Sequence, residues 1–111
     1  MRVLAAPDKF RGSLTALEVT SAIEKAVEKS GWIATGAPLA DGGEGTLEVL
    51  GGANRTTTVT GPSGTPVEAE WRLADRTAVI EVARVSGLAL AGGPESNNPL
   101  EATSKGTGEL I

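Results

Sequence analysis

The order of apolar runs, one amphipathic segment and glycine-rich loops over the first 54 residues constrains the fold more than any other feature of the sequence. An apolar run at residues 2–6 stops at Pro7 and is typical of an inner strand of a parallel sheet, buried on both faces. Residues 14–29 have helical periodicity, residues 32–39 form a weaker second strand, and residues 46–50 form a short helix closed by two glycines. This order predicts an α/β fold that begins with a parallel, Rossmann-like layer.

The helix predicted over residues 14–29 carries signals at both ends. Thr15 and Glu18 have the spacing of a capping box, in which each side chain bonds the backbone N–H of the other residue. Ser30-Gly31 predicts the end of the helix, because glycine readily adopts the left-handed conformation that closes helices. One apolar stripe is expected to pack on the sheet, and it consists of Val19, Ile23, Ala26 and Val27.

The pattern changes after residue 54, so we expect a first domain of residues 1–54 and a second, incomplete domain of residues 55–111. Residues 55–60 are rich in threonine, a turn follows, and a third run with high strand propensity covers residues 77–83. Apolar residues alternate with polar ones on the strand between them, at Val67, Ala69, Trp71 and Leu73. We expect an antiparallel meander of three strands, whose edge is able to pair either with another chain in a homo-oligomer or with the remainder of its own, longer chain.

The last part of the sequence begins with a loop and ends in an unfinished helix. Residues 91–99 have the composition of a loop, and Thr107 is the candidate N-cap of the final helix. The sequence stops before this helix completes an apolar turn, so we expect it to be a fragment of a longer protein.

The composition excludes several classes of chemistry. The chain has no cysteine and no histidine, which excludes disulfides, thiol nucleophiles, imidazole bases and ordinary structural zinc sites. The absence of cysteine fits a reducing, cytoplasmic location, and the initial apolar run is too short for a signal peptide or a membrane span. A net charge of −4 gives no reason to expect nucleic acid or a membrane surface as a partner.

Two loops that follow predicted strands carry candidate functional side chains. In the first, Lys9 and Arg11 precede a helix and suit an anion, although the alternative is that both are merely solvated and Ser13 only caps the helix. In the second, Asp41 and Glu44 stand among three glycines, and Asp41 suits a hydroxyl proton or Mg²⁺. The alternative there is a solvated turn whose carboxylates cap the short helix.

A third glycine-rich cluster, Ser104-Lys-Gly-Thr-Gly108, suits phosphate oxygens. It does not complete a known nucleotide fingerprint, because the sequence has no Gly-x-x-x-x-Gly-Lys-Ser/Thr motif. The dinucleotide pattern would need glycine where Ile111 stands. The residues therefore exclude a P-loop or a dinucleotide-binding site of the usual kind.

Three segments together resemble the amino-terminal portion of the glycerate kinase family, of the bacterial, glycerate 2-kinase-like type. They are Ala6-Pro-Asp-Lys-Phe-Arg-Gly-Ser-Leu14, Pro38-Leu-Ala-Asp-Gly-Gly-Glu-Gly-Thr46, and Asn98-Pro99 followed by Thr103-Ser104 and Gly106-Thr-Gly-Glu-Leu-Ile111. The likeness runs along nearly the whole chain. Lys105 departs from the aromatic residue that the family often has in the last motif.

The resemblance implies a longer two-domain α/β kinase that uses ATP and Mg²⁺ to phosphorylate D-glycerate to 2-phosphoglycerate. We expect this stretch alone to be inactive. On this reading, Lys9 and Arg11 hold the substrate carboxylate or the phosphoryl group, and Asp41 takes the hydroxyl proton or the metal. The residues expected to support substrate binding are Asp8, Ser13, Glu44, Ser104 and Thr107. A kinase acting on the 3-hydroxyl and a non-catalytic anion-binding domain are the alternatives.

Overall fold

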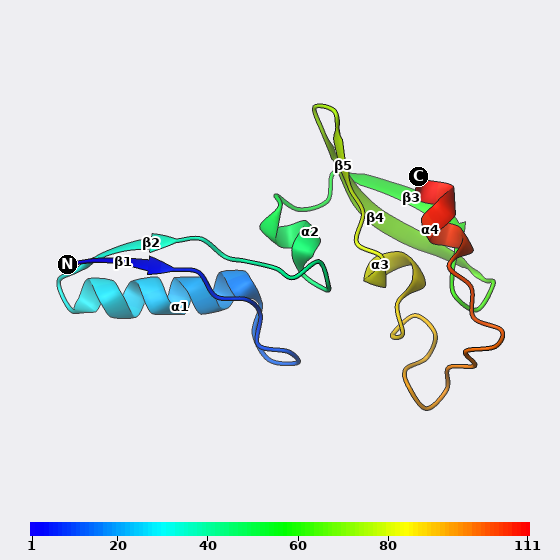
Figure 1. Ribbon diagram of the computed structural model, residues 1–111, viewed down its shortest axis with the longest axis horizontal. Coiled ribbons are helices and arrows are strands. Elements are labelled where there is room, and N and C mark those ends of the chain that lie inside the picture. The colour runs from blue at the N-terminus through cyan, green and yellow to red at the C-terminus, as the bar shows by residue number, and fades with distance from the viewer. The chain divides into compact units, whose positions relative to one another are not determined.

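The computed structural model describes all residues, Met1–Ile111, and divides into two compact units, Met1–Val49 and Leu50–Ile111 (Figure 1). The first unit contains a parallel two-stranded sheet and the second an antiparallel three-stranded sheet. The mixed α/β class predicted from the sequence is therefore confirmed. The unit boundary lies five residues before the predicted domain boundary, and the assignment of domains itself stays a prediction.

The first unit is built on a strand, helix, strand arrangement. Strand β1 (Arg2–Ala5) pairs in parallel with β2 (Ile33–Gly36), and helix α1 (Ala16–Lys29) connects them. Helix α1 packs against both strands. A short helix, α2 (Thr46–Val49), follows the second glycine-rich loop. The connection by a helix is what two neighbouring parallel strands require.

Helix α1 has the capping box that the sequence predicts. The Glu18 N–H donates to Thr15 Oγ1 (3.2 Å), and the Thr15 N–H donates to Glu18 Oε2 (2.8 Å). The bonds that the Thr15 N–H and then the Thr15 hydroxyl donate to the Glu18 carboxylate lower the pKa of Glu18, the backbone bond more than the hydroxyl bond. At the other end, Gly31 has the left-handed conformation (φ 75°) that closes the helix.

The two faces of the first sheet differ in exposure. Ala5 is buried, and Gly36 lies so close to α1 that a Cβ there would contact Thr20 and Glu24. On the other face, Leu4 is 67% exposed and Ile33 is 62% exposed. The expectation of an inner strand buried on both faces is therefore wrong for the described chain, because α1 covers only one face.

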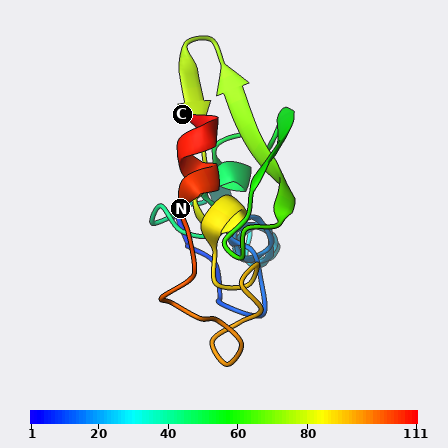
Figure 2. The ribbon, with the colours of Figure 1, turned by 90° about the vertical axis from the view of Figure 1, so that its right-hand side faces the viewer.

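The second unit is a meander of β3 (Arg55–Thr60), β4 (Pro66–Ala74) and β5 (Thr77–Val79) with two short helices. Helices α3 (Ala83–Ser86) and α4 (Lys105–Leu110) lie against the sheet, and Figure 2 shows α4 beside the strands. The core consists of Val59, Ala69 and Val85, with Val67, Ile80 and Leu110 packed against it.

The third strand is shorter than the sequence predicts. It ends at Val79, and Ala83 belongs to α3 rather than to a strand extending over residues 77–83. The physical reason is an ionic network at this point. Glu81 is buried and pairs with Arg84 (3.5 Å), and the Arg84 guanidinium also reaches Glu70 on β4 (2.6 Å). The turn of α3 keeps the buried carboxylate beside its partner.

Helix α4 begins two residues before the predicted N-cap. Ser104 precedes its first residue, and Thr107 lies inside the helix, so the prediction of Thr107 as N-cap is wrong. The cause is a close approach of the helix to β3: a Cβ at Gly106 would collide with the carbonyl oxygen of Thr60. Glu109 secures the contact by accepting from the Thr60 N–H (2.7 Å), which is the main reason that the pKa of Glu109 is lowered.

None of the helices combines the length and apolar character needed to span a lipid bilayer.

Candidate functional site

In the first unit, the loops after β1 and β2 run side by side. The chain continues parallel pairing beyond the strands, because the Ala37 N–H donates to Ala5 O (2.7 Å) and the Leu39 N–H donates to Pro7 O (2.9 Å). These bonds bring the segment that begins at Asp8 next to the segment that reaches Asp41. The carboxyl ends of parallel strands are where open α/β sheets bind ligands.

Lys9 connects the two loops. Its Nζ lies 3.6 Å from Asp41 Oδ1 and 4.0 Å from Asp8 Oδ1, and its side chain is only 21% exposed. The stem of the lysine passes the glycine-rich loop, where a Cβ at Gly45 would lie 3.9 Å from Lys9 Cδ. Glycine at position 45 also has φ 95°, a conformation that other residues rarely adopt. The loop therefore lies close to the lysine and presents Asp41 to it.

Asp41 is a charged and accessible carboxylate. The Gly43 N–H donates to its Oδ1 (2.9 Å), and this bond, followed by the charge of Lys9, lowers the pKa of Asp41. The side chain remains 70% exposed. A carboxylate with a lowered pKa is a weak proton acceptor, so this setting favours orienting a hydroxyl or binding a cation over strong base catalysis.

Three other residues of the predicted site do not join this cluster. Arg11 is exposed at the tip of a turn and makes no ion pair. The hydroxyl of Ser13 donates to Phe10 O (3.0 Å) and closes the same turn. Glu44 is exposed beside Asp41 in the sequence without a contact to Lys9. The structure thus brings together Asp8, Lys9 and Asp41, whereas Arg11, Ser13 and Glu44 lie on the surrounding loops.

The described residues do not form a metal site. The chain has no group of three or more Asp, Glu, His or Cys side chains placed to hold a metal ion. The charged neighbour of Asp41 is the ammonium group of Lys9, which competes with a cation for the same oxygen. These residues alone do not fit a magnesium centre, and the metal role of Asp41 stays a prediction.

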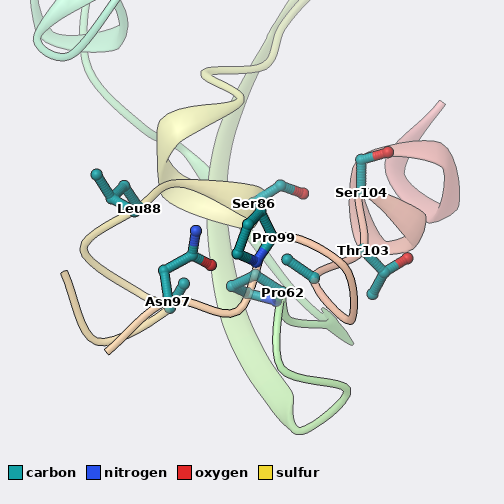
Figure 3. A pocket seen from close by; sticks show the side chains of 9 residues that line it. Pro62, Ser86, Leu88, Asn97, Pro99, Thr103 and Ser104 are labelled. Atoms are coloured by element: carbon teal, nitrogen blue, oxygen red, sulfur yellow. The ribbon is translucent and has the colours of Figure 1, made fainter. Parts of the chain in front are cut away.

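The second unit contains a pocket of about 370 Å³, shown in Figure 3. Ser104, a predicted site residue, lines it. Thr107 does not line it, but its hydroxyl lies 2.8 Å from that of Ser86, which does. The other polar lining residues are Asn97 and Thr103, and the apolar walls include Pro62, Leu88 and Pro99. No sequence motif predicts this pocket, although Asn98-Pro99 and Thr103-Ser104, which resemble the family motif, lie at or next to its lining.

Comparison with a family model and with known proteins points to the same family in each case. The family model described as Glycerate kinase family matches residues 3–111. The chain is 45% identical to "Glycerate 2-kinase" of Escherichia coli strain K12 and 44% identical to "Glycerate kinase" of Bacillus subtilis strain 168, and in both cases all of this chain is covered. It spans only 31% of the length of each relative.

A solved structure is similar to this chain over its whole length. A crystal structure from Salmonella typhimurium LT2 that carries the name glycerate kinase 2 matches all of this chain at 42% identity and a TM-score of 0.80. The matched region is 32% of that chain. The likeness therefore holds for sequence and backbone alike.

Proposed function

The chain belongs to the glycerate kinase family, and on this premise we propose that it is the amino-terminal portion of an enzyme that transfers a phosphoryl group from ATP to D-glycerate. The observation that carries the proposal is the contact of Lys9 with Asp41 across two loops at the carboxyl ends of parallel strands. The name of the Escherichia coli relative supports the 2-hydroxyl as the acceptor, which gives 2-phosphoglycerate.

The cluster residues and Arg11, which lies outside the cluster, have separate roles in the proposed reaction. The acceptor hydroxyl attacks the terminal phosphorus, the bond from that phosphorus to the ADP oxygen breaks, and the hydroxyl proton passes to Asp41 late in the transfer and from there to water. Asp41 accepts a hydrogen bond from the hydroxyl and orients it, and Lys9 keeps Asp41 in place. Arg11 binds the glycerate carboxylate, for which its exposed guanidinium is free.

The remaining predicted residues support this arrangement. Asp8 is a second carboxylate near the Lys9 ammonium group (4.0 Å), and Ser13 closes the turn that carries Arg11. Glu44, Ser104 and Thr107 are proposed to contribute hydrogen bonds to the substrates. Mg²⁺ would accompany ATP and neutralise phosphate charge, and no step in this scheme depends on its position. We also propose a cytoplasmic location, supported by the absence of cysteine.

The test is a product analysis with the longer enzyme that contains this chain. Incubation with ATP and D-glycerate should give 2-phosphoglycerate, identified by ³¹P and ¹³C NMR through the carbon that carries phosphorus. Formation of 3-phosphoglycerate would support the kinase activity but show that the 3-hydroxyl, and not the 2-hydroxyl, is the phosphoryl acceptor. Failure to form either product would refute the proposal.

One observation favours a second function, a non-catalytic domain that binds small anions. The sequence lacks both common nucleotide fingerprints. Titration calorimetry separates the two functions, because a kinase binds both glycerate and ATP, whereas the alternative predicts heat with glycerate alone. The measurement should compare the 111-residue chain with the longer enzyme.

A further inference from the structure

The pocket of the Leu50–Ile111 unit has an uncharged lining, which distinguishes it from the Lys9 cluster. Its polar side chains are hydroxyls and one carboxamide, and its other walls are proline, leucine and alanine. No lysine or arginine lines it. Glycerate and phosphate are anions, and this pocket offers them no countercharge. Its ligand is therefore expected to be an uncharged group.

The volume of the pocket also favours a ligand larger than glycerate. At about 370 Å³ it lies within the range of small-molecule sites, which is roughly 300–1,000 Å³. A three-carbon acid would leave most of this space unfilled. A flat heterocycle would contact several walls at once, because the apolar groups come from separate segments, with Pro62 after β3, Leu88 after α3 and Pro99 before α4.

Hydrogen bonding within the protein shows which polar groups remain for a ligand. Ser86 is engaged with Thr107 (2.8 Å), and Thr103 Oγ1 accepts from the Lys105 N–H (3.1 Å). The half-buried Asn97 differs from both. Its backbone N–H donates to Gly93 O (3.1 Å), but its carboxamide has no partner within the chain. In Figure 3 this carboxamide lies between Leu88 and the two prolines.

A carboxamide presents a donor and an acceptor side by side in one plane. The edge of adenine offers the complementary pair, an amino donor next to a ring nitrogen, and asparagine is a usual bidentate partner of this edge. We propose that the pocket receives the adenine of the phosphoryl donor, with Asn97 bonded to the edge of the base and Leu88, Pro62 and Pro99 against its faces. This inference rests on the proposed kinase function for the identity of the donor.

The first experiment uses Asn97→Ala in the longer enzyme, with adenosine as a probe that lacks phosphate. Loss of the bidentate pair should raise the Kd for adenosine and the KM for ATP by roughly tenfold or more. The KM for glycerate should not change. Asn98→Ala is the matched control, because Asn98 bonds the Leu100 N–H (3.2 Å) in the same loop but does not line the pocket. Equal effects of the two substitutions would overturn the proposal.

A second variant tests the hydrogen-bond pattern rather than its loss. Asn97→Asp replaces the donor and acceptor by two acceptors, which match the two N–H donors on the edge of guanine. The ratio of kcat/KM for ATP over GTP should fall by roughly tenfold or more. An unchanged ratio would mean that Asn97 does not contact the base.

A measurement on the unsubstituted enzyme covers the case in which a variant does not fold. Addition of adenosine should shift the side-chain NH₂ resonances of Asn97, and those of Asn98 should shift less. Shifts of Asn97 with glycerate alone would assign the pocket to the acceptor and refute the proposal. If the Asn97 resonances shift with adenosine but no phosphoglycerate forms, the kinase proposal fails and the adenine-binding proposal stands. If phosphoglycerate forms but adenosine does not shift the Asn97 resonances, the adenine-binding proposal fails and the kinase proposal stands.

Discussion

Lys9 has its charge shared between two carboxylates, and this limits what the cluster offers to an anion. Asp8, Lys9 and Asp41 together carry a formal charge of −1, counted as two carboxylates and one ammonium group. A negatively charged substrate therefore gains no net attraction from these three groups. The attraction has to come from elsewhere on the loops, and Arg11 is the nearest cation in sequence without an ion pair.

Replacement of Arg11 by alanine should raise the KM for glycerate. Loss of a charge-assisted hydrogen bond to a carboxylate costs about 1.5–3 kcal/mol, which corresponds to roughly 10- to 150-fold. The kcat should change much less, because the carboxylate is remote from the reacting hydroxyl. Steady-state kinetics with glycerate as the varied substrate measures this, and an unchanged KM would assign the carboxylate to another residue.

Replacement of Asp41 by asparagine should lower kcat by about 100-fold, the lower range for loss of a group that assists proton transfer. The fold should persist, because the side chain is largely exposed. Glu28→Gln, at an exposed carboxylate of α1, is the control for the change of net charge. Near-normal turnover of Asp41→Asn at saturating substrate would remove Asp41 from the mechanism.

The pKa of Asp41 should respond only in part to loss of Lys9. In Lys9→Met the pKa should rise but stay below the ordinary value of 3.8, because the Gly43 N–H is the larger cause of its lowering. A lowered pKa stabilises the folded state above pH 3.8, and this contribution disappears as the pH falls through the folded pKa. Titration of the Asp41 carboxyl carbon by NMR measures the shift. A pKa equal to that of the unsubstituted protein would show that Lys9 is not a close partner in solution.

At the scale of elements, signals confined to a few residues predicted structure well. The capping box of Thr15 and Glu18 and the glycine at position 31 located α1 to within about two residues. The errors arose where distant residues decide the outcome. Strand β5 stops early because Arg84, the partner of the buried Glu81, is also held by Glu70 on β4, and the start of α4 depends on its approach to Thr60. The Arg84–Glu70 and Gly106–Thr60 contacts join residues that are far apart in the sequence, so no local pattern contains them.

Gly106 and Gly108 on α4 offer a matched test of the close packing of α4 against β3 at Thr60. Gly106→Ala places a Cβ against the Thr60 carbonyl, so it should destabilise the protein by about 1–3 kcal/mol, the usual cost of overpacking. Gly108→Ala meets nothing within 4 Å and should be neutral or stabilising, by up to about 1 kcal/mol. Denaturant unfolding monitored by tryptophan fluorescence gives both values. Equal stabilities would contradict the packing of α4 on β3.

At the scale of the whole molecule, the sequence located part of the candidate site. It placed Lys9 and Asp41 on loops after parallel strands, and the structure puts their side chains in contact. It did not place the pocket of the second unit, because the pocket is assembled from residues between 62 and 104 that come together only through the meander and its helices. The shared role of all these residues in one reaction stays a prediction.

The 111-residue chain by itself should show no ATP-dependent phosphorylation of glycerate, whereas the longer enzyme should. The chain spans only 31% of its relatives and contains no cluster of metal ligands of its own. Circular dichroism first establishes that both proteins are folded. A coupled assay for ADP at equal protein concentrations then compares their rates of phosphorylation. Turnover by the short chain would place the complete reaction centre within these residues.

The uncovered face of the first sheet has a practical consequence for anyone who prepares this stretch in isolation. Leu4 and Ile33 present branched hydrocarbon to water on a two-stranded sheet whose outer edges also carry unpaired peptide groups. Such a surface promotes concentration-dependent aggregation. Light scattering should therefore rise faster with protein concentration for this chain than for the double variant Leu4→Lys, Ile33→Lys.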